Sequence, residues 1–358
     1  MTKLALFLGS VASVLLCCVS YAQDRGWASS IAWSPDGQTI AVGGGDGVRF
    51  FDNDFVEVGF VEVEHTVEHA PRLVKWNASG DLLVHSSFLS SIKVVDVSAK
   101  KVLLEIEVPE SGLWTPVHWH PKENLIVGGT IQGTTHIWDA TTGEELFMFD
   151  NPAEPSDLGH PVPLGFCWFA NSKVAIVTSL AAFVVDITQN KILREYVGYF
   201  GYDWTSCNRN YQILSPDGWL IDLNTGRDSI IPGLGRNGQS IVDFFPLALA
   251  WSPAADLIVS NLNGCRIRVF EFDGWSGRLA AELSGGAYYI PSVGFHLGSI
   301  GWHPSGSRFA VVGEFGEVRV WDAKTYELMH QFDGFELHPN LLARLGDQDL
   351  PTVRSCPQ

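Results

Sequence analysis

The chain has 358 residues, of which 46% are hydrophobic and 12% aromatic, and its formal net charge at pH 7 is −17. A chain this acidic repels phosphate backbones and anionic lipid, and the sequence holds no basic cluster that offsets this charge, which argues against nucleic-acid binding and membrane-surface attachment. The acidity keeps the protein soluble, and it also suits a basic partner.

The first 22 residues have the pattern of an export signal. Thr2-Lys3 gives a short positive start, and the apolar run from Leu4 to Val19 is too short to span a membrane comfortably. Small residues in Ser20-Tyr21-Ala22 stand where a signal peptidase reads. We therefore expect cleavage before Gln23 and a secreted, periplasmic or cell-envelope location, with an uncleaved anchor as the alternative.

The cysteines leave two questions open. A lipid on Cys17 or Cys18 is a further alternative, although the residue before each of them is not small. After cleavage four cysteines remain, an even count that suits disulfides in an exported chain, and none has the close paired spacing of a zinc site. Four cysteines allow three pairings, and the sequence does not choose among Cys167, Cys207, Cys265 and Cys356.

One sequence unit recurs along the rest of the chain. Its first copy, Trp33 to Asp52, reads WSPDGQTIAVGGGDGVRFFD, and its clearest copy, Gly301 to Asp322, reads GWHPSGSRFAVVGEFGEVRVWD. The leading tryptophans recur every 36 to 51 residues, and an acid follows each of them by 18 to 20 residues. The tryptophans are Trp33, Trp76, Trp119, Trp168, Trp204, Trp251 and Trp302, and the acids are Asp52, Asp96, Asp139, Asp186, Asp222, Glu271 and Asp322.

This spacing predicts repeated β-meanders. Short apolar runs between glycine turns are typical of strands, and a period of 40 to 50 residues indicates radial or solenoidal repetition. In the first copy we expect strands at residues 30–33, 39–43, 48–52 and 55–60. The first three runs are nearly continuous in apolar residues, so we expect them to be covered on both faces.

Two dipeptides and one turn carry a family resemblance. Trp138-Asp139 and Trp321-Asp322 close their units, and Trp33-Ser34-Pro35-Asp36-Gly37 opens the first. The chain resembles WD40-repeat proteins over roughly residues 27 to 333, which implies an all-β fold, a seven-bladed β-propeller of four-stranded antiparallel blades. The Gly-His dipeptide of strong WD40 repeats is nearly absent, with Gly159-His160 the nearest case. We therefore expect apolar packing, rather than a buried Asp-His-Ser-Trp network, to hold the ring.

The last unit already contains its own outer strand at residues 326–332. We therefore expect every blade to be continuous in sequence, with blade seven packed directly on blade one. The predicted organisation is a signal peptide at 1–22, a propeller at 23–333 and a C-terminal tail of open role at 334–358. We expect a monomer.

The long connections between units are rich in aromatic residues. The resemblance implies that these loops share one face, and large rigid aromatics dominate binding hot spots. We expect an exported, non-catalytic platform for a protein or peptide partner; alternatively, these side chains seal the mouth of the barrel. The predicted partner-binding face comprises Trp114, Phe244, Phe245, Tyr288, Tyr289 and Phe295.

The strongest match to a catalytic motif is His65-Thr66-Val67-Glu68-His69, preceded by Glu62 and Glu64. It fits the inverted zinc-protease pattern, which needs both histidines on one face of a helix. The strand-like alternation before it argues against that chemistry, while adventitious metal binding at this cluster stays open. We expect no catalytic residue, cofactor or dedicated metal site; the alternative is a propeller enzyme or metal-dependent hydrolase with its site at the central channel.

Two histidines stand at a turn position. His120-Pro121 and His303-Pro304 occupy the place that Ser34-Pro35 has in the first unit. We expect these histidines to make structural hydrogen bonds in place of the serine hydroxyl.

Overall fold

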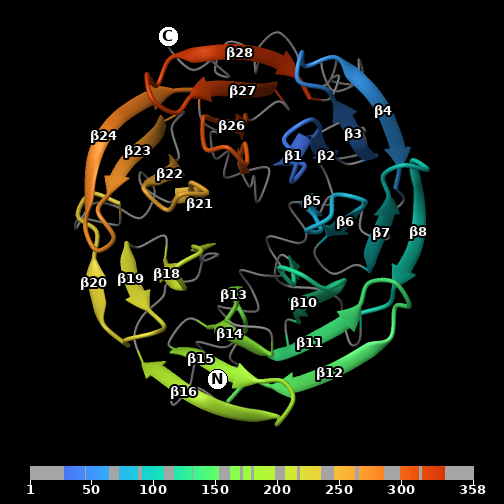
Figure 1. The fold of residues 1–358 in the computed structure, drawn as a ribbon, viewed down its shortest axis with the longest axis vertical. Helices are drawn as coiled ribbons and strands as arrows, with labels where there is room; N and C mark the ends of the chain where they lie inside the picture. The colour runs from blue at the N-terminus through green and yellow to red at the C-terminus, as the bar shows by residue number, and fades with distance from the viewer. Residues whose placement is uncertain are drawn as a thin grey trace, which may run out of the picture.

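The protein forms a closed ring of seven blades, seen down its axis in Figure 1. The computed structural model describes residues 28–44, 46–63, 72–87, 91–108, 117–130, 132–152, 162–169, 172–178, 181–197, 206–215, 218–234, 246–262, 266–285, 299–313 and 317–334. These residues are built from β-strands and turns without a helix. Accordingly, no helix within these ranges is long and apolar enough to cross a membrane.

Each blade is an antiparallel sheet of four strands that follow one another in the chain. Blade one comprises β1 (Ala28–Trp33), β2 (Ile40–Gly44), β3 (Gly47–Phe51) and β4 (Glu57–Glu62); blade two comprises β5 (Arg72–Trp76), β6 (Leu82–Ser87), β7 (Ile92–Asp96) and β8 (Lys101–Ile106). Blade three comprises β9 (His118–Trp119), β10 (Leu125–Gly129), β11 (Thr134–Asp139) and β12 (Glu145–Asp150). Blade four comprises β13 (Gly165–Trp168), β14 (Lys173–Val177), β15 (Ala181–Asp186) and β16 (Lys191–Val197).

The remaining three blades repeat the same order. Blade five comprises β17 (Ser206–Cys207), β18 (Gln212–Leu214), β19 (Trp219–Asp222) and β20 (Asp228–Ile230). Blade six comprises β21 (Pro246–Trp251), β22 (Leu257–Leu262), β23 (Arg266–Phe272) and β24 (Gly277–Ser284), and blade seven comprises β25 (Ile300–Trp302), β26 (Arg308–Val312), β27 (Glu317–Asp322) and β28 (Leu328–Asp333). The first strand of each blade lies nearest the ring axis and the fourth forms the rim (Figure 1). The predicted seven-bladed, all-β architecture is confirmed.

Apolar packing fills every seam between neighbouring blades. Seven clusters of buried side chains, one at each seam, hold the ring together. Middle strands such as β2 are buried along their length, whereas rim strands such as β12 alternate between exposed and half-buried positions. This difference follows because an inner strand lies between two neighbouring blades while a rim strand has one side in water.

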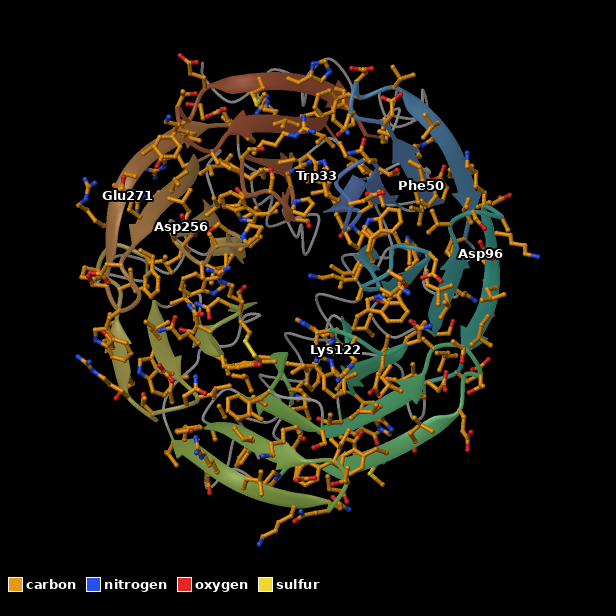
Figure 2. The ribbon with its side chains drawn as sticks, in the orientation of Figure 1. Trp33, Phe50, Asp96, Lys122, Asp256 and Glu271 are labelled. Atoms are coloured by element: carbon orange, nitrogen blue, oxygen red, sulfur yellow. A yellow bond between two sulfur atoms is a disulfide. The ribbon has the colours of Figure 1, made fainter. Side chains whose placement is uncertain are left out.

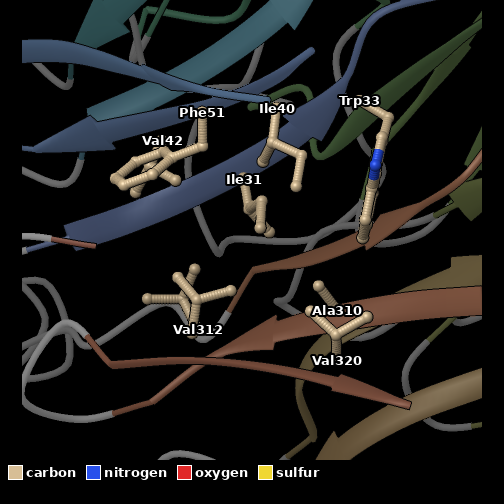
Figure 3. Close-up of a cluster of buried hydrophobic side chains, with 9 residues drawn as sticks. Ile31, Trp33, Ile40, Val42, Phe51, Ala310, Val312 and Val320 are labelled. Atoms are coloured by element: carbon tan, nitrogen blue, oxygen red, sulfur yellow. The ribbon is translucent and has the colours of Figure 1, made fainter. Parts of the chain in front are cut away.

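The ring closes as expected, by packing of blade seven on blade one. Figure 3 shows Ile31 and Val42 of blade one facing Ala310 and Val312 of blade seven in one cluster. At the rim of the same seam the rings of Phe51 and Phe332 lie 4.8 Å apart. Because each blade keeps all four of its own strands, closure depends on this buried contact and not on a strand shared between the termini.

The turn between the first two strands explains the Trp-Ser-Pro-Asp-Gly sequence. Ser34 Oγ accepts a hydrogen bond from the Thr39 amide at 2.9 Å, and Gly37 has φ of 72°, which a residue with a side chain reaches only with strain. Pro35 packs against the same turn of the next blade, where a Cβ added to Gly80 would lie 3.2 Å from its ring. Proline and glycine therefore interlock one turn with the next around the ring.

Two details of the predicted repeat are wrong. In blade five the first strand ends at Cys207, so this cysteine and not Trp204 occupies the leading position; Trp204 itself lies outside the described residues. In blade six the turn acid is Asp273, whose carboxylate accepts from the amides of Trp275 and Ser276. Glu271 instead pairs with Arg278 across β23 and β24.

Candidate functional site

Four of the leading tryptophans bind their blade to the one before it, whereas the buried indole nitrogens of Trp33 and Trp302 have no hydrogen-bond partner among the described residues. Four indole nitrogens donate hydrogen bonds to a backbone carbonyl of the preceding blade, always at the residue just before that blade's own leading position. The pairs are Trp76 to Ala32 at 3.0 Å, Trp119 to Lys75 at 2.9 Å, Trp168 to His118 at 3.5 Å and Trp251 to Ser206 at 3.4 Å. These bonds cross the seams at the inner strands, so the recurrent tryptophan is a structural residue.

At the seam between blades four and five a disulfide takes the place of this bond. Cys207 occupies the tryptophan position of blade five, and it is bonded to Cys167, the residue just before Trp168. The two Cα atoms lie 5.7 Å apart. This pairing resolves two of the four cysteines; Cys265 and Cys356 lie outside the described residues. An alignment of blade five on Asn208, which opens its turn, places Cys207 at the leading position.

The recurrent acids cap the turn between the third and fourth strands. Asp139 Oδ1 accepts hydrogen bonds from the Thr141 amide at 2.7 Å and from the Thr141 hydroxyl at 2.5 Å. The Thr141 hydroxyl and amide hold the pKa of Asp139 below its usual value, and the amides of Thr325 and Lys324 do the same for Asp322. Figure 2 shows that Asp96 lies toward the rim, whereas Trp33 lies nearer the axis. The turn acids are therefore structural, as the sequence predicted.

His120 and His303 cap the turn that Ser34 caps in blade one, which confirms the prediction. His120 Nδ1 accepts from the amides of Lys122 and Glu123, at 3.3 and 3.0 Å. His303 Nδ1 accepts from the Ser305 amide at 3.2 Å. Both imidazoles are thus engaged in local turn structure.

Blade three contains a chain of polar contacts that resembles a catalytic relay. Glu145 Oε2 lies 2.8 Å from His136 Nδ1, and His136 Nε2 lies 2.8 Å from Thr134 Oγ1. Thr134 Oγ1 in turn lies 2.6 Å from Thr130 Oγ1. His136 is buried and stacked on Trp138, with ring centroids 5.4 Å apart. Because the buried imidazole is held on both nitrogens, this chain joins β11 to its neighbours and satisfies a buried polar group.

The inner wall carries a lysine and a histidine side by side. Lys75 and His118 stand just before the leading tryptophans of blades two and three, on the innermost strands β5 and β9. Lys75 is exposed to water and His118 is half-buried. Burial, and then the charge of Lys75, lowers the pKa of His118 to about 3, so this imidazole is neutral at pH 7. The sequence reasoning missed this pair, although the repeat places both residues at the same position.

The six aromatic residues of the predicted partner-binding face all lie outside the described residues, as do Glu64, His65, Glu68 and His69. Glu62 is exposed at the end of β4. Within the described ranges, no group of three or more His, Cys, Asp or Glu side chains is arranged to hold a metal ion. The aromatic face and the Glu/His cluster thus stay predictions.

The fold and its turns define a seven-bladed β-propeller of WD-repeat type. The family model described as WD domain, G-beta repeat matches residues 15–52. This match covers the first three strands of blade one, and together with the seven four-stranded blades it supports the assignment to the WD40-repeat β-propellers. A comparison with curated protein sequences gives no match.

Solved structures share the fold at low sequence identity. Hydrazine synthase from Kuenenia stuttgartiensis aligns with a TM-score of 0.65 and 15% identity, covering 85% of this chain and 98% of the other. The Cps50 (Swd1) β-propeller domain from Myceliophteria thermophila aligns with a TM-score of 0.64 and 15% identity, covering 82% and 96%. A chain of the Mitotic Checkpoint Complex aligns with a TM-score of 0.60 and 12% identity, covering 80% and 84%. At these identities the likeness concerns the fold alone.

Proposed function

We propose that the chain is an exported, non-catalytic propeller that serves as a binding platform for a protein or peptide partner. The observation that carries this proposal is how the repeated polar groups are used. Leading tryptophans, turn aspartates and turn histidines all serve seams and turns, at Trp119, Asp139 and His120 for example. A ring locked in this way is a rigid frame on which variable loops can present binding residues.

The family match favours a binding role. WD40 propellers commonly bind protein partners, and the WD-domain family model matches residues 15–52 of this chain. The net charge of −17 suits a partner with a basic surface, since charge complementarity raises the rate of association. We infer that a basic protein or peptide binds the loop face.

The disulfide supports export. Disulfides persist in oxidising compartments and are rare in the reducing cytosol. Cys167 and Cys207 are bonded between inner strands, and the chain begins with a segment that has the pattern of a signal peptide. Together these two features favour a secreted, periplasmic or cell-envelope location.

The platform is tested by cross-linking capture with the chain that starts at Gln23, incubated with the envelope fraction and culture fluid of the native host. We expect one partner to be enriched, and its capture to weaken between 50 and 300 mM salt if the partner is basic. Mass spectrometry of the endogenous protein, which should begin at Gln23, tests export in the same preparation. An intact Met1 would contradict export, and capture that is equal with heat-unfolded protein would contradict a platform.

A further inference from the structure

The seven inner strands carry no acidic residue, although the chain has 40 acidic residues against 23 basic ones. The only charged residues in these strands are Arg72 and Lys75, both in β5. In a chain with a net charge of −17, the strands that lie nearest the ring axis in Figure 1 therefore contain no negatively charged residue. The second strands of the blades likewise carry no acidic residue, so the acids that lie within strands belong to the third and fourth strands of the blades.

The backbone of Lys75 is held in place, while its ammonium has no ion-pair partner in the part of the chain that the structure describes. Its carbonyl accepts the Trp119 indole bond at 2.9 Å, which fixes the backbone of β5 against blade three. Among the described residues no carboxylate pairs with its ammonium. Water reaches the side chain, but the surrounding wall removes part of its hydration and lowers the pKa of Lys75. An opposite charge nearby stabilises the charged form of a lysine, so an anion bound here would stabilise the Lys75 ammonium.

His118 occupies the equivalent position on the neighbouring inner strand β9. Its ring packs edge-on against Phe166 of blade four, with ring centroids 6.1 Å apart. A neutral imidazole offers one N–H donor and one acceptor nitrogen, so it can add a directional hydrogen bond to a bound anion. In blade four the equivalent position, just before the leading tryptophan, holds Cys167, and its disulfide to Cys207 fixes the inner wall beside His118.

We propose that Lys75 and His118 form a binding site for a small carboxylate at the inner wall of the ring. One ammonium matches one negative charge, and hydrogen bonds between charged groups are the stronger kind. Polyanions such as phosphate meet the repulsion of a protein with a net charge of −17. The carboxylate comes either from a free organic acid or from the end of a peptide chain, and the site recognises the same group in both. This site does not depend on the platform role.

The test uses N-acetylglycine, its uncharged analogue N-acetylglycinamide, and phosphate, each at matched ionic strength, added to the folded chain from Gln23. Lysine ¹⁵N NMR follows the ammonium signals, and calorimetry measures affinity. The matched variants are Lys75→Met and Lys122→Met, because Lys122 is an exposed lysine on a neighbouring turn, labelled in Figure 2. Each variant is first checked for an unchanged melting temperature.

We expect N-acetylglycine to shift the Lys75 signal saturably, and Lys75→Met to weaken binding by about tenfold or more, as loss of a charged hydrogen bond predicts. Lys122→Met should bind as the wild type does. A tripeptide with a free C-terminus that binds more tightly than N-acetylglycine would identify a peptide end as the source, and the reverse order would identify a free acid. Equal binding of N-acetylglycinamide, tighter binding of phosphate, or unchanged affinity in Lys75→Met would overturn the proposal.

Discussion

Breaking the Cys167–Cys207 bond should cost more than breaking any single indole bond at the other seams. The disulfide closes a sequence separation of 40 residues. In the chain-entropy treatment such a loop restricts the unfolded state by roughly 13 cal/mol/K, which is about 4 kcal/mol at 25 °C. A neutral hydrogen bond such as the indole bonds contributes about 1 kcal/mol. For a propeller of this size the loss corresponds to a fall in Tm of roughly 6 °C.

The assay is urea unfolding of the oxidised protein, the protein under dithiothreitol and the Cys167→Ala, Cys207→Ala variant. The reduced protein keeps the volume of both side chains, so it isolates the cross-link from any cavity. A control with Cys265 and Cys356 replaced by alanine accounts for the other thiols. If oxidised and reduced proteins differ by less than about 0.5 kcal/mol, the apolar cluster around Ala175 holds this seam and the reasoning is wrong.

A second variant tests whether an indole hydrogen bond can replace the disulfide at the seam between blades four and five. Cys167→Ala with Cys207→Trp keeps the backbone carbonyl that the other blades use as the indole acceptor. We expect it to recover about 1 kcal/mol relative to the double alanine variant. Stability equal to or below that of the double alanine variant would show that this seam does not accept an indole bond.

Three further predictions concern Trp321, the pair Tyr288 and Tyr289, and His118. Trp321→Ala removes a ring that is 3% exposed and stacked on Phe309, so calorimetry should show a loss of roughly 3 to 5 kcal/mol, and any binding should fall only with the folded fraction. The double variant Tyr288→Ala, Tyr289→Ala should abolish partner capture, because each hot-spot ring contributes about 2 kcal/mol or more of binding free energy. Its melting midpoint should shift little. A lowered midpoint would mean that the two tyrosines seal the mouth of the barrel. The pKa of His118 in the folded protein is about 3, below the value of 6.5 for a free imidazole. The free energy of unfolding should therefore fall by roughly 1 kcal/mol per pH unit as the pH drops from 6 to 4, because the unfolded chain takes up a proton that the folded chain does not. The His118→Asn variant should show a smaller slope, and an unchanged slope would contradict the burial of a neutral imidazole.

The architecture was predictable because the part of each blade from its leading residue to its turn acid has a nearly fixed length. Strand pairing and the two intervening turns set that length, so spacing alone fixes seven blades and their order. The first blade was expected at residues 30–33, 39–43, 48–52 and 55–60 and is observed as β1 to β4, with ends that differ by one or two residues. Fraying and turn geometry set these ends, and a hydrophobic pattern does not resolve them.

The same reliance on spacing led to the wrong leading residue in blade five and the wrong turn acid in blade six. Blade five has shorter strands, so Trp204 falls at the expected interval while Cys207 occupies the structural position. In blade six Glu271 falls at the expected interval, but a carboxylate must sit two or three residues before the amides it accepts from, and Asp273 does. An interval locates a residue along the chain, whereas hydrogen-bond geometry decides which residue performs the role.

The position just before each leading residue shows why the inner wall is the most informative part of this chain. Its backbone carbonyl accepts the indole bond from the next blade, at Ala32, Lys75, His118 and Ser206. The seam therefore uses the main chain and leaves the side chain free to vary, so the same position holds a methyl group, an ammonium, an imidazole and a hydroxyl. At Cys167 that freedom provides a covalent link, and at Lys75 and His118 it provides the two polar groups of the proposed site. A repeat that fixes structure through its backbone can change its chemistry one blade at a time.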